Sequence, residues 1–190
     1  MIDAQVAADA DQPGLEVGAA VKGVERLEDL QEVKACSKLP VLRKDFILDP
    51  WQILESRSIG ADCILIILAA VNDAMAQELI NLSKNLGIDT LIEVHNENEL
   101  DRAIKLDGDL IGINNRNLKT LTIDIETTIK LAPLIPKKYD IVSESGIELN
   151  EDLNRISQLG IKRFLVGESL IKNSDIKSVT KKLLGLGKNK

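Results

Sequence analysis

Charged and amide side chains stand within or at the ends of several apolar runs in this sequence, where folding could bring them together. They are Lys44, Glu93, Asn114 and Glu144. Glu93 lies between Ile92 and Val94, and because a buried, unpaired carboxylate is costly, such a group is usually paired or functional. A lysine facing a carboxylate across a pocket forms an acid–base pair. These residue types therefore indicate proton-transfer chemistry.

Glycines follow the last two apolar runs and indicate an anion site. Gly146 comes directly after Glu144 and Ser145, and Gly167 directly precedes Glu168. Glycine lets backbone N–H groups approach an anion closely, which requires no net positive charge on the protein. In barrel enzymes the loops after the last two strands commonly bind a phosphate. We therefore expect a phosphate cradle at these turns, the alternative being two plain tight turns.

The elements that must position these residues alternate along the chain. Six short apolar runs, rich in β-branched residues, are typical of strands buried on both faces of a parallel sheet. They begin at residues 41, 63, 90, 110, 140 and 163. The amphipathic segments between them have helical spacing, with cap candidates at Asp49, Asn150 and Ser174 and a glycine stop at Gly87.

A strand every 20–30 residues predicts a βα repeat, which leaves an open doubly wound sheet or a closed barrel. Neither GxGxxG nor GxxxxGK[ST] follows a strand, so the barrel is favoured. In a barrel the carboxyl ends of the strands meet at one mouth. A surface lysine or a turn-capping asparagine would be ordinary alone, but five polar strand ends together predict one shared pocket.

The first 38 residues do not follow the repeat. We expect residues 1–14 to be irregular or weakly helical, residues 15–21 to form at most a seventh strand, and a short helix around Leu27, Leu30 and Val33. The fold class is therefore α/β, a (β/α)8 TIM-barrel type that is incomplete and whose sheet stays unclosed. We divide the chain into an atypical segment 1–25, a partial barrel 26–176 and a basic helix and tail 177–190.

Composition excludes several functional classes. The 190 residues are 44% hydrophobic and 28% charged, with a net charge of −6, which favours neither a nucleic-acid nor a membrane partner. No apolar run approaches the roughly 18–20 residues that a membrane span needs, and the acidic start does not resemble a secretory signal. Two cysteines, Cys36 and Cys63, fit a reduced, cytoplasmic location.

Five segments resemble motifs of the indole-3-glycerol phosphate synthase family, in strand order, over about residues 26–173. They are LPVLRKDF (39–46), LIEVH (91–95), GINNRNL (112–118), SESG (143–146) and FLVGESL (164–170). The resemblance implies a TIM-barrel lyase of tryptophan biosynthesis that needs no cofactor or metal. It would close 1-(2-carboxyphenylamino)-1-deoxyribulose 5-phosphate to indole-3-glycerol phosphate, with loss of CO2 and water.

The resemblance also implies a role for each matching residue. Lys44 would be the general acid, Glu93 the base or proton shuttle of the dehydration, and Asn114 and Glu144 would orient the substrate. For Lys44 this chemistry calls for a pKa drawn toward neutrality by a dry site. The remaining assignments are Arg116 for the departing carboxylate, Phe46 for the aromatic ring, and Ser145, Gly146, Gly167 and Glu168 for the phosphate. We interpret His95, the only histidine, as a structural loop residue.

The start of the chain departs from the family pattern. Residues 1–38 lack the Glu-x-Lys pair of the first strand, the Ser-Pro-Ser phosphate loop and the helical extension that precede the matching region in the family. We therefore expect less than full activity from this polypeptide alone. An unclosed sheet would also leave open edges on the third and eighth strands, which would favour self-association.

Two other functions remain open from the sequence. One is a non-catalytic, phospholigand-binding or self-associating barrel fragment. The other is a different phosphosugar barrel, such as a phosphoribosylanthranilate isomerase-like enzyme, which should use an early cysteine and a later aspartate. Cys36 is predicted to lie in a helix rather than at a strand end, which disfavours the second alternative.

Overall fold

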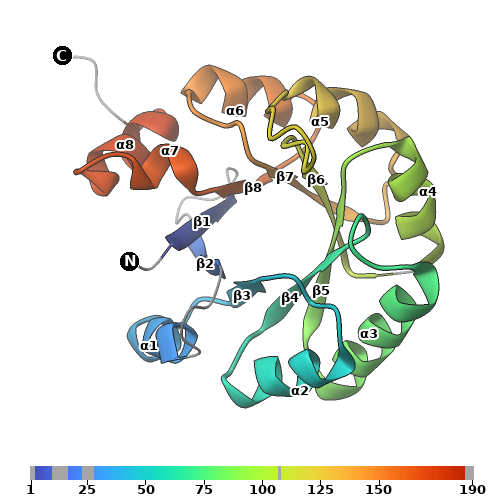
Figure 1. Ribbon diagram of the computed structural model, residues 1–190. Helices are drawn as coiled ribbons and strands as arrows, with labels where there is room; N and C mark the ends of the chain where they lie inside the picture. Colours follow the sequence, from blue (N-terminus) through green and yellow to red (C-terminus); the bar gives the residue numbers. More distant parts are fainter. Residues whose placement is uncertain (1–2, 10–16, 23–27, 107, 187–190) are drawn as a thin grey trace.

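The computed structural model describes residues 3–9, 17–22, 28–106 and 108–186, and its sheet is a closed barrel with the strands in sequence order (Figure 1). The strands are β1 (Asp3–Asp9), β2 (Val17–Lys22), β3 (Val41–Lys44), β4 (Cys63–Ile67), β5 (Asp89–Val94), β6 (Leu110–Asn114), β7 (Asp140–Glu144) and β8 (Arg163–Val166). Neighbouring strands from β2 to β8 are parallel.

The helices form a ring outside the barrel (Figure 1). They are α1 (Glu28–Cys36), α2 (Pro50–Ser58), α3 (Asp73–Leu86), α4 (Glu97–Leu106), α5 (Glu126–Leu131) with the 3-10 turn η1 (Ala132–Leu134), α6 (Asn150–Ser157), α7 (Glu168–Ile171) and α8 (Ile176–Leu183). The six predicted strand–helix units from β3 onward are thus confirmed, and so is the short helix before them.

The amino-terminal strands account for the incomplete βα repeat. β1 is antiparallel to both β2 and β8, unlike the parallel strands that follow. The expectation of irregular or weakly helical structure is therefore wrong for residues 3–9, while residues 1, 2 and 10–14 lie outside the described residues. The strand predicted at residues 15–21 is observed as β2 from residue 17 onward, while residues 15 and 16 lie outside the described residues.

The predicted open edges are also not observed, because β2 pairs with β3 and β1 pairs with β8. The number of βα units in the sequence could not predict that the sheet closes. An antiparallel pair needs only a short connection, whereas each parallel pair needs a crossover of a dozen or more residues.

Strand side chains alternate between two apolar layers. Leu65, Leu91, Val142 and Leu165 pack inside the barrel, whereas Ile64, Ile66, Ile92 and Ile113 pack between the sheet and the helices. In β3, Arg43 points outward, where its guanidinium contacts Glu55 at 2.8 Å and Ser56 at 3.0 Å on α2. Because strand side chains alternate with a period of two, Lys44 points inward.

The observed helix caps match the predicted ones at α2 and α3 and differ from them at α6 and α8. The Asp49 carboxylate accepts a hydrogen bond from the Trp51 N–H at the start of α2, and Gly87 ends α3 in the left-handed conformation, as predicted. At α6 the Asp152 carboxylate binds the N–H groups of Glu148 and Leu149, so Asn150 is not the cap. At α8 the cap is Asp175 rather than Ser174.

No helix among the described residues is both long and apolar enough to cross a membrane.

Candidate active site

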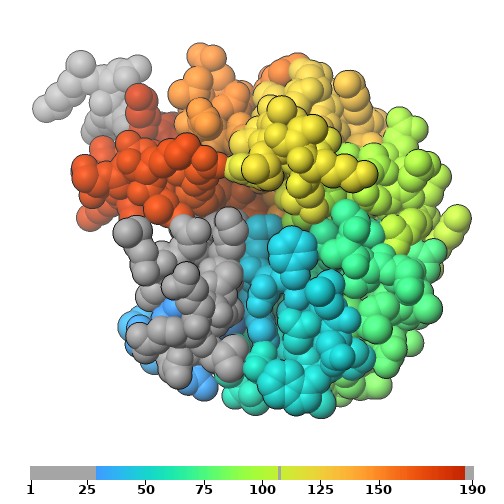
Figure 2. Space-filling view, viewed as in Figure 1, coloured from blue at the N-terminus to red at the C-terminus, as the bar shows by residue number. Residues whose placement is uncertain are grey.

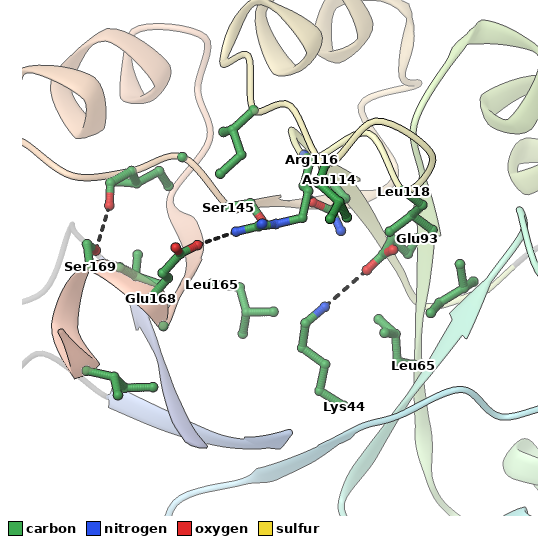
Figure 3. A pocket seen from close by; sticks show the side chains of 18 of the residues that line it. Lys44, Leu65, Glu93, Asn114, Arg116, Leu118, Ser145, Leu165, Glu168 and Ser169 are labelled. Carbon is green, nitrogen blue, oxygen red and sulfur yellow. Dashed lines mark hydrogen bonds and ion pairs between the residues drawn. The ribbon is translucent and has the colours of Figure 1, made fainter. Parts of the chain in front are cut away.

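Lys44 holds the centre of the barrel mouth between two carboxylates from different strands. Its Nζ lies 2.8 Å from Glu144 Oε2. It also lies 3.1 Å from Glu93 Oε2, the contact drawn in Figure 3. The Lys44 side chain is 13% exposed, and both glutamates are 1% exposed. Three strands of distant sequence, β3, β5 and β7, thus place their ionic residues in one buried cluster, as the sequence predicts.

The cluster shifts the pKa of each of its members. Burial alone would lower the pKa of Lys44, but Glu144 and Glu93 outweigh it and raise that pKa above its ordinary value. Burial raises the pKa of Glu144, and the nearby Glu93 adds to this, against the opposing effect of Lys44. Burial acts likewise on Glu93, but His95 and Lys44 together lower its pKa.

The expected shift of Lys44 toward neutrality is therefore wrong for this ligand-free arrangement. A dry site favours a neutral lysine only when no anion lies near it. Here two carboxylates within 3.1 Å stabilise the ammonium, so Lys44 carries a proton that it can donate.

Gly112 on β6 makes room for Glu144 inside the barrel. A Cβ atom at this glycine would lie 2.1 Å from Glu144 Oε1 and 3.2 Å from the Leu91 side chain. Any larger residue would force the carboxylate away, because real Cβ atoms do not approach that closely. Glu144 Oε1 itself is buried without a hydrogen-bond partner among the described residues.

The end of β6 supplies an amide and a cation to the mouth. The side-chain oxygen Oδ1 of Asn114 accepts a hydrogen bond from the Arg116 backbone N–H at 3.0 Å. The same Asn114 amide further lowers the pKa of the Glu93 carboxyl. The Arg116 guanidinium reaches across the pocket to form an ion pair with Glu168 (Figure 3). Glu168 in turn binds Lys172 at 2.6 Å.

The turn after β7 has an unusual backbone. Ser145 has φ 65° and Gly146 has φ 76°, so two consecutive residues adopt the left-handed region, which is rare for a residue with a side chain. A Cβ atom at Gly146 would also lie 2.5 Å from the Ile123 side chain. Glycine is required here on both counts.

A buried network holds that turn in place. The Asn115 amide nitrogen donates to the Ser145 carbonyl at 3.0 Å and to Ser143 Oγ at 3.3 Å, while its oxygen accepts from the N–H and hydroxyl of Thr128. Asn115 is 2% exposed. It therefore does more than cap a turn, because it joins β6, β7 and α5.

The turn after β8 lies beside the turn after β7. Ser169 Oγ donates a hydrogen bond to the Ile147 carbonyl at 3.0 Å, and the Ser145 N–H donates to the Leu165 carbonyl at 3.4 Å. The two glycine turns that the sequence singles out are thus joined at one side of the mouth.

A pocket of about 700 Å³ opens where these elements meet. On the face shown in Figure 2, the segments after β3, β6 and β8 (cyan, yellow and red) lie around it. The predicted residues that line it are Lys44, Phe46, Glu93, Asn114, Arg116, Ser145, Gly146, Gly167 and Glu168. Glu144 lies beneath this lining and reaches the pocket only through Lys44.

Sequence reasoning missed part of the apolar wall. Leu121 and Ile123 line the pocket from the loop between β6 and α5, next to Leu118. Leu121 has φ 61° and is 64% exposed. Three apolar residues in a turn-rich segment after a strand are a signal that could have identified a wall built for an apolar ligand group.

Other residues weighed in the sequence lie elsewhere. Cys36 is the last residue of α1 rather than a residue at a strand end, as predicted, and its side chain is exposed. Within the described residues, His, Cys, Asp and Glu side chains form no group that could hold a metal ion.

Comparison with known proteins places this site in a sequence family. A family model described as indole-3-glycerol phosphate synthase matches residues 22–183. A relative of that name from Azospirillum brasilense is 52% identical over 155 residues, which are 82% of this chain and 59% of the relative. Another from Dehalococcoides mccartyi is 46% identical over 161 residues, 85% and 62% respectively. The chain thus spans about three-fifths of the length of these curated relatives.

Solved structures support the barrel. The 3-hexulose-6-phosphate synthase of Salmonella typhimurium gives a TM-score of 0.74 at 13% identity, covering 88% of this chain and 85% of that one. A tryptophan synthase alpha-subunit from Pyrococcus furiosus gives 0.67 at 17% identity, covering 84% and 72%. At such identities the likeness shows the fold alone.

Proposed function

Since the chain belongs to the indole-3-glycerol phosphate synthase family, we propose that its pocket carries out the ring closure of that family. The substrate is 1-(2-carboxyphenylamino)-1-deoxyribulose 5-phosphate, and the products are indole-3-glycerol phosphate, CO2 and water. The observation that carries the proposal is the protonated Lys44 between Glu93 and Glu144, at the mouth of the barrel and above an apolar floor.

Lys44 acts as the general acid of the ring closure. The aromatic carbon that bears the carboxylate attacks the ribulose carbonyl carbon, and the carbonyl oxygen takes the proton from Lys44 Nζ. The bond to the carboxylate then breaks, CO2 leaves, and its electron pair restores the aromatic ring. A substrate that draws either carboxylate away from Lys44 lowers the pKa of the ammonium and makes it a stronger acid.

Glu93 acts in the dehydration that follows. After Lys44 has regained a proton from solvent, its Nζ protonates the new hydroxyl, which leaves as water, while Glu93 accepts the proton that the five-membered ring loses. Its lowered pKa keeps it ionised and able to accept. Asn114 and Glu144 orient the reacting groups, Asn114 by direct contact and Glu144 through Lys44, from which it lies 2.8 Å.

The rest of the pocket matches the two ends of this substrate. Arg116 supplies a cation for the carboxylate that departs, and Phe46, which is 52% exposed, supplies a flat apolar wall for the aromatic ring. The joined turns at Ser145, Gly146, Gly167 and Glu168 would hold the phosphate through the backbone N–H groups of the last three and the hydroxyl of Ser145, whose own N–H donates to the Leu165 carbonyl. This arrangement needs no basic side chain.

We expect the activity to be reduced relative to a full-length family member. The chain spans about three-fifths of its curated relatives and lacks the Glu-x-Lys and Ser-Pro-Ser elements of the family's first strand and loop. Removing members of a group that acts as a unit can remove most of the rate, even when the other members stay in place.

The test is to add the substrate to the purified chain, follow the fluorescence of indole-3-glycerol phosphate, and measure the molecular mass of the protein in the same buffer. Turnover by a monomer that disappears in Lys44→Met supports the proposal. Tight binding of inorganic phosphate without turnover would instead support the non-catalytic, phospholigand-binding fragment.

A further inference from the structure

His95, the single histidine of the chain, lies directly after β5 with its imidazole between two carboxylates. Its Nε2 lies 3.2 Å from Glu93 Oε1, and its Nδ1 lies 2.9 Å from Glu99 Oε2. The ring is 11% exposed and is not part of the pocket lining. His95 therefore approaches Glu93 from behind, on the side away from Lys44.

We propose that His95 is a positioning residue, which keeps the Glu93 carboxylate ionised and holds one of its oxygens toward Lys44. The inference deepens the function proposed above, in which Glu93 accepts a proton. His95 itself touches no substrate in this arrangement.

The outer carboxylate fixes the imidazole. Glu99 Oε2, on α4, accepts hydrogen bonds from both the Nδ1 side of the ring and the backbone N–H of His95, the latter at 2.8 Å. Glu99 Oε1 accepts from the Asn96 amide at 2.7 Å. With Nδ1 held in this way, Nε2 faces Glu93 Oε1 at 3.2 Å, an ion-pair contact without hydrogen-bond geometry, while Glu93 Oε2 faces Lys44 at 3.1 Å.

The charged groups around the His95 ring favour its protonated form, the imidazolium. Within the described part of the chain, the ionic groups in contact with the ring are Glu93 from β5 and Glu99 from α4, while Lys44 from β3 faces the other Glu93 oxygen and Glu144 from β7 faces Lys44. Burial would lower the pKa of His95, but Glu93 and Glu99 raise it to about 9.

The coupling between the two groups is reciprocal. If the ionised Glu93 makes the imidazolium a weaker acid by some factor, the imidazolium makes the Glu93 carboxyl a stronger acid by the same factor. A titration of His95 therefore also measures how strongly His95 holds Glu93 in its ionised form.

Because the chain has one histidine, the imidazole nitrogen signals in a ¹⁵N–¹H NMR spectrum report this residue alone. We expect Glu93→Gln and Glu99→Gln each to raise the acid dissociation constant of the imidazolium about tenfold or more. The control is Glu97→Gln, which removes an exposed carboxylate at the start of α4 and should leave the acid dissociation constant of the imidazolium unchanged. An unchanged constant in Glu93→Gln would overturn the proposal, and this readout needs no catalytic activity.

Kinetics separate positioning from plain structural support. Glutamine at residue 95 carries no charge but can donate a hydrogen bond to Glu93. Leucine carries no charge and cannot donate a hydrogen bond. We expect His95→Leu to lower kcat about tenfold at every pH, with KM little changed. His95→Gln should recover most of kcat at pH 8. On acidification its kcat should begin to fall at a higher pH than that of the parent chain, because Glu93 takes up a proton more readily without the imidazolium.

Equal pH profiles in the parent and His95→Gln, or a loss confined to KM, would contradict the positioning role. A parent chain without turnover would instead contradict the proposed function, and it would leave the NMR result on Glu93 and His95 standing.

Discussion

At the scale of single residues, the ionic cluster is arranged to keep a proton on Lys44. Two carboxylates of 1% exposure face one ammonium, and the pKa of Lys44 is raised while that of Glu93 is lowered. Burying ionic groups is costly unless they are paired, so the three residues depend on one another for stability as well as for chemistry.

Lys44→Met should therefore affect both properties. We expect activity to fall at least a hundredfold, because no other group donates to the carbonyl. We expect a loss of stability of up to about 3–5 kcal/mol, since two buried carboxylates lose their cation, and a smaller loss at pH 5.5 than at pH 8, because one carboxylate can then take up a proton.

Rates and urea unfolding at both pH values test this, with Lys105→Met on the exposed side of α4 as the control. A variant that keeps more than a tenth of the parent rate would show that Lys44 is not the acid.

The ion pair between Arg116 and Glu168 competes with any carboxylate that binds in the pocket. We expect Glu168→Gln to increase the affinity for anthranilate two- to fivefold, since exposed ion pairs are worth about 0–1 kcal/mol. Arg116→Gln should weaken binding. Lys172→Gln removes the other partner of Glu168 and provides the control. Fluorescence titration with anthranilate measures all three, and weaker binding to Glu168→Gln would rule out the competition.

At the scale of elements, the site depends on a buried amide that contacts no ligand. Asn115 joins β6, β7 and α5 and holds the left-handed turn at Ser145 and Gly146. The turn would otherwise relax, because a non-glycine residue with positive φ is strained.

Asn115→Ala should destabilise the chain by about 2–4 kcal/mol, because it leaves the Thr128 hydroxyl and the Ser145 carbonyl with fewer partners in a buried site. We also expect weaker phosphate binding, measured by the rise in thermal midpoint on adding phosphate. The matched control is Asn85→Ala on the exposed face of α3. Equal stability of the two variants would show that the network is dispensable.

The sequence predicts the elements from β3 onward because their cause is local. Buried parallel strands need continuous apolar runs, and helices need caps and a periodic face, as around Asp49 and Gly87. The Asp- and Ala-rich β1 has no such pattern, and only its pairing with β2 and β8 makes it a strand.

The site is predictable to the same extent. The parallel strand order brings Lys44, Glu93 and Asn114 to one pocket, so their convergence could be deduced from strand ends alone. The direction in which the Lys44 pKa shifts could not be deduced, because it depends on how closely the two carboxylates approach Nζ, here within 3.1 Å. The contact of His95 with Glu93 depends likewise on how Glu99 of α4 fixes the ring.

At the scale of the whole molecule, β1 and β2 close the barrel and cover the edges of β3 and β8. An exposed strand edge is a template for pairing with another chain, so closure removes that route to self-association.

Ala7→Pro tests this closure, because proline removes an N–H from a strand that has neighbours on both sides. We expect the parent chain and an Ala7→Ser control to show the mass of a monomer in light scattering, and Ala7→Pro to form larger species. We also expect β8 amides to exchange hydrogen faster in Ala7→Pro. A parent chain that already associates would contradict protection by closure.

The stability of the molecule should vary with pH in two directions. His95 has a pKa of about 9, above its ordinary 6.5, so its ion pairs contribute fully below pH 6.5 and are lost as the pH rises through 9. The raised pKa of Glu144 acts in the same direction. Glu93 has a lowered pKa, so its contribution is present above pH 4.5 and is lost as the pH falls.

We therefore expect the thermal midpoint to be highest near pH 5–6.5 and to fall several degrees by pH 9, at about 2–4 °C per kcal/mol. His95→Gln should flatten the alkaline side. A midpoint that rises from pH 6.5 to 9 in the parent chain would contradict the assigned shifts.

The reversed direction of β1 has a practical consequence for handling the protein. Asp3 is in register with Lys22, and Lys22 with Lys44, so β1 begins at the rim of the barrel that bears Lys44. We therefore expect an affinity tag or fusion partner at the amino terminus to interfere with the proposed pocket. Assays of enzymatic rate should therefore use protein whose purification handle has been cleaved off or moved to the opposite terminus.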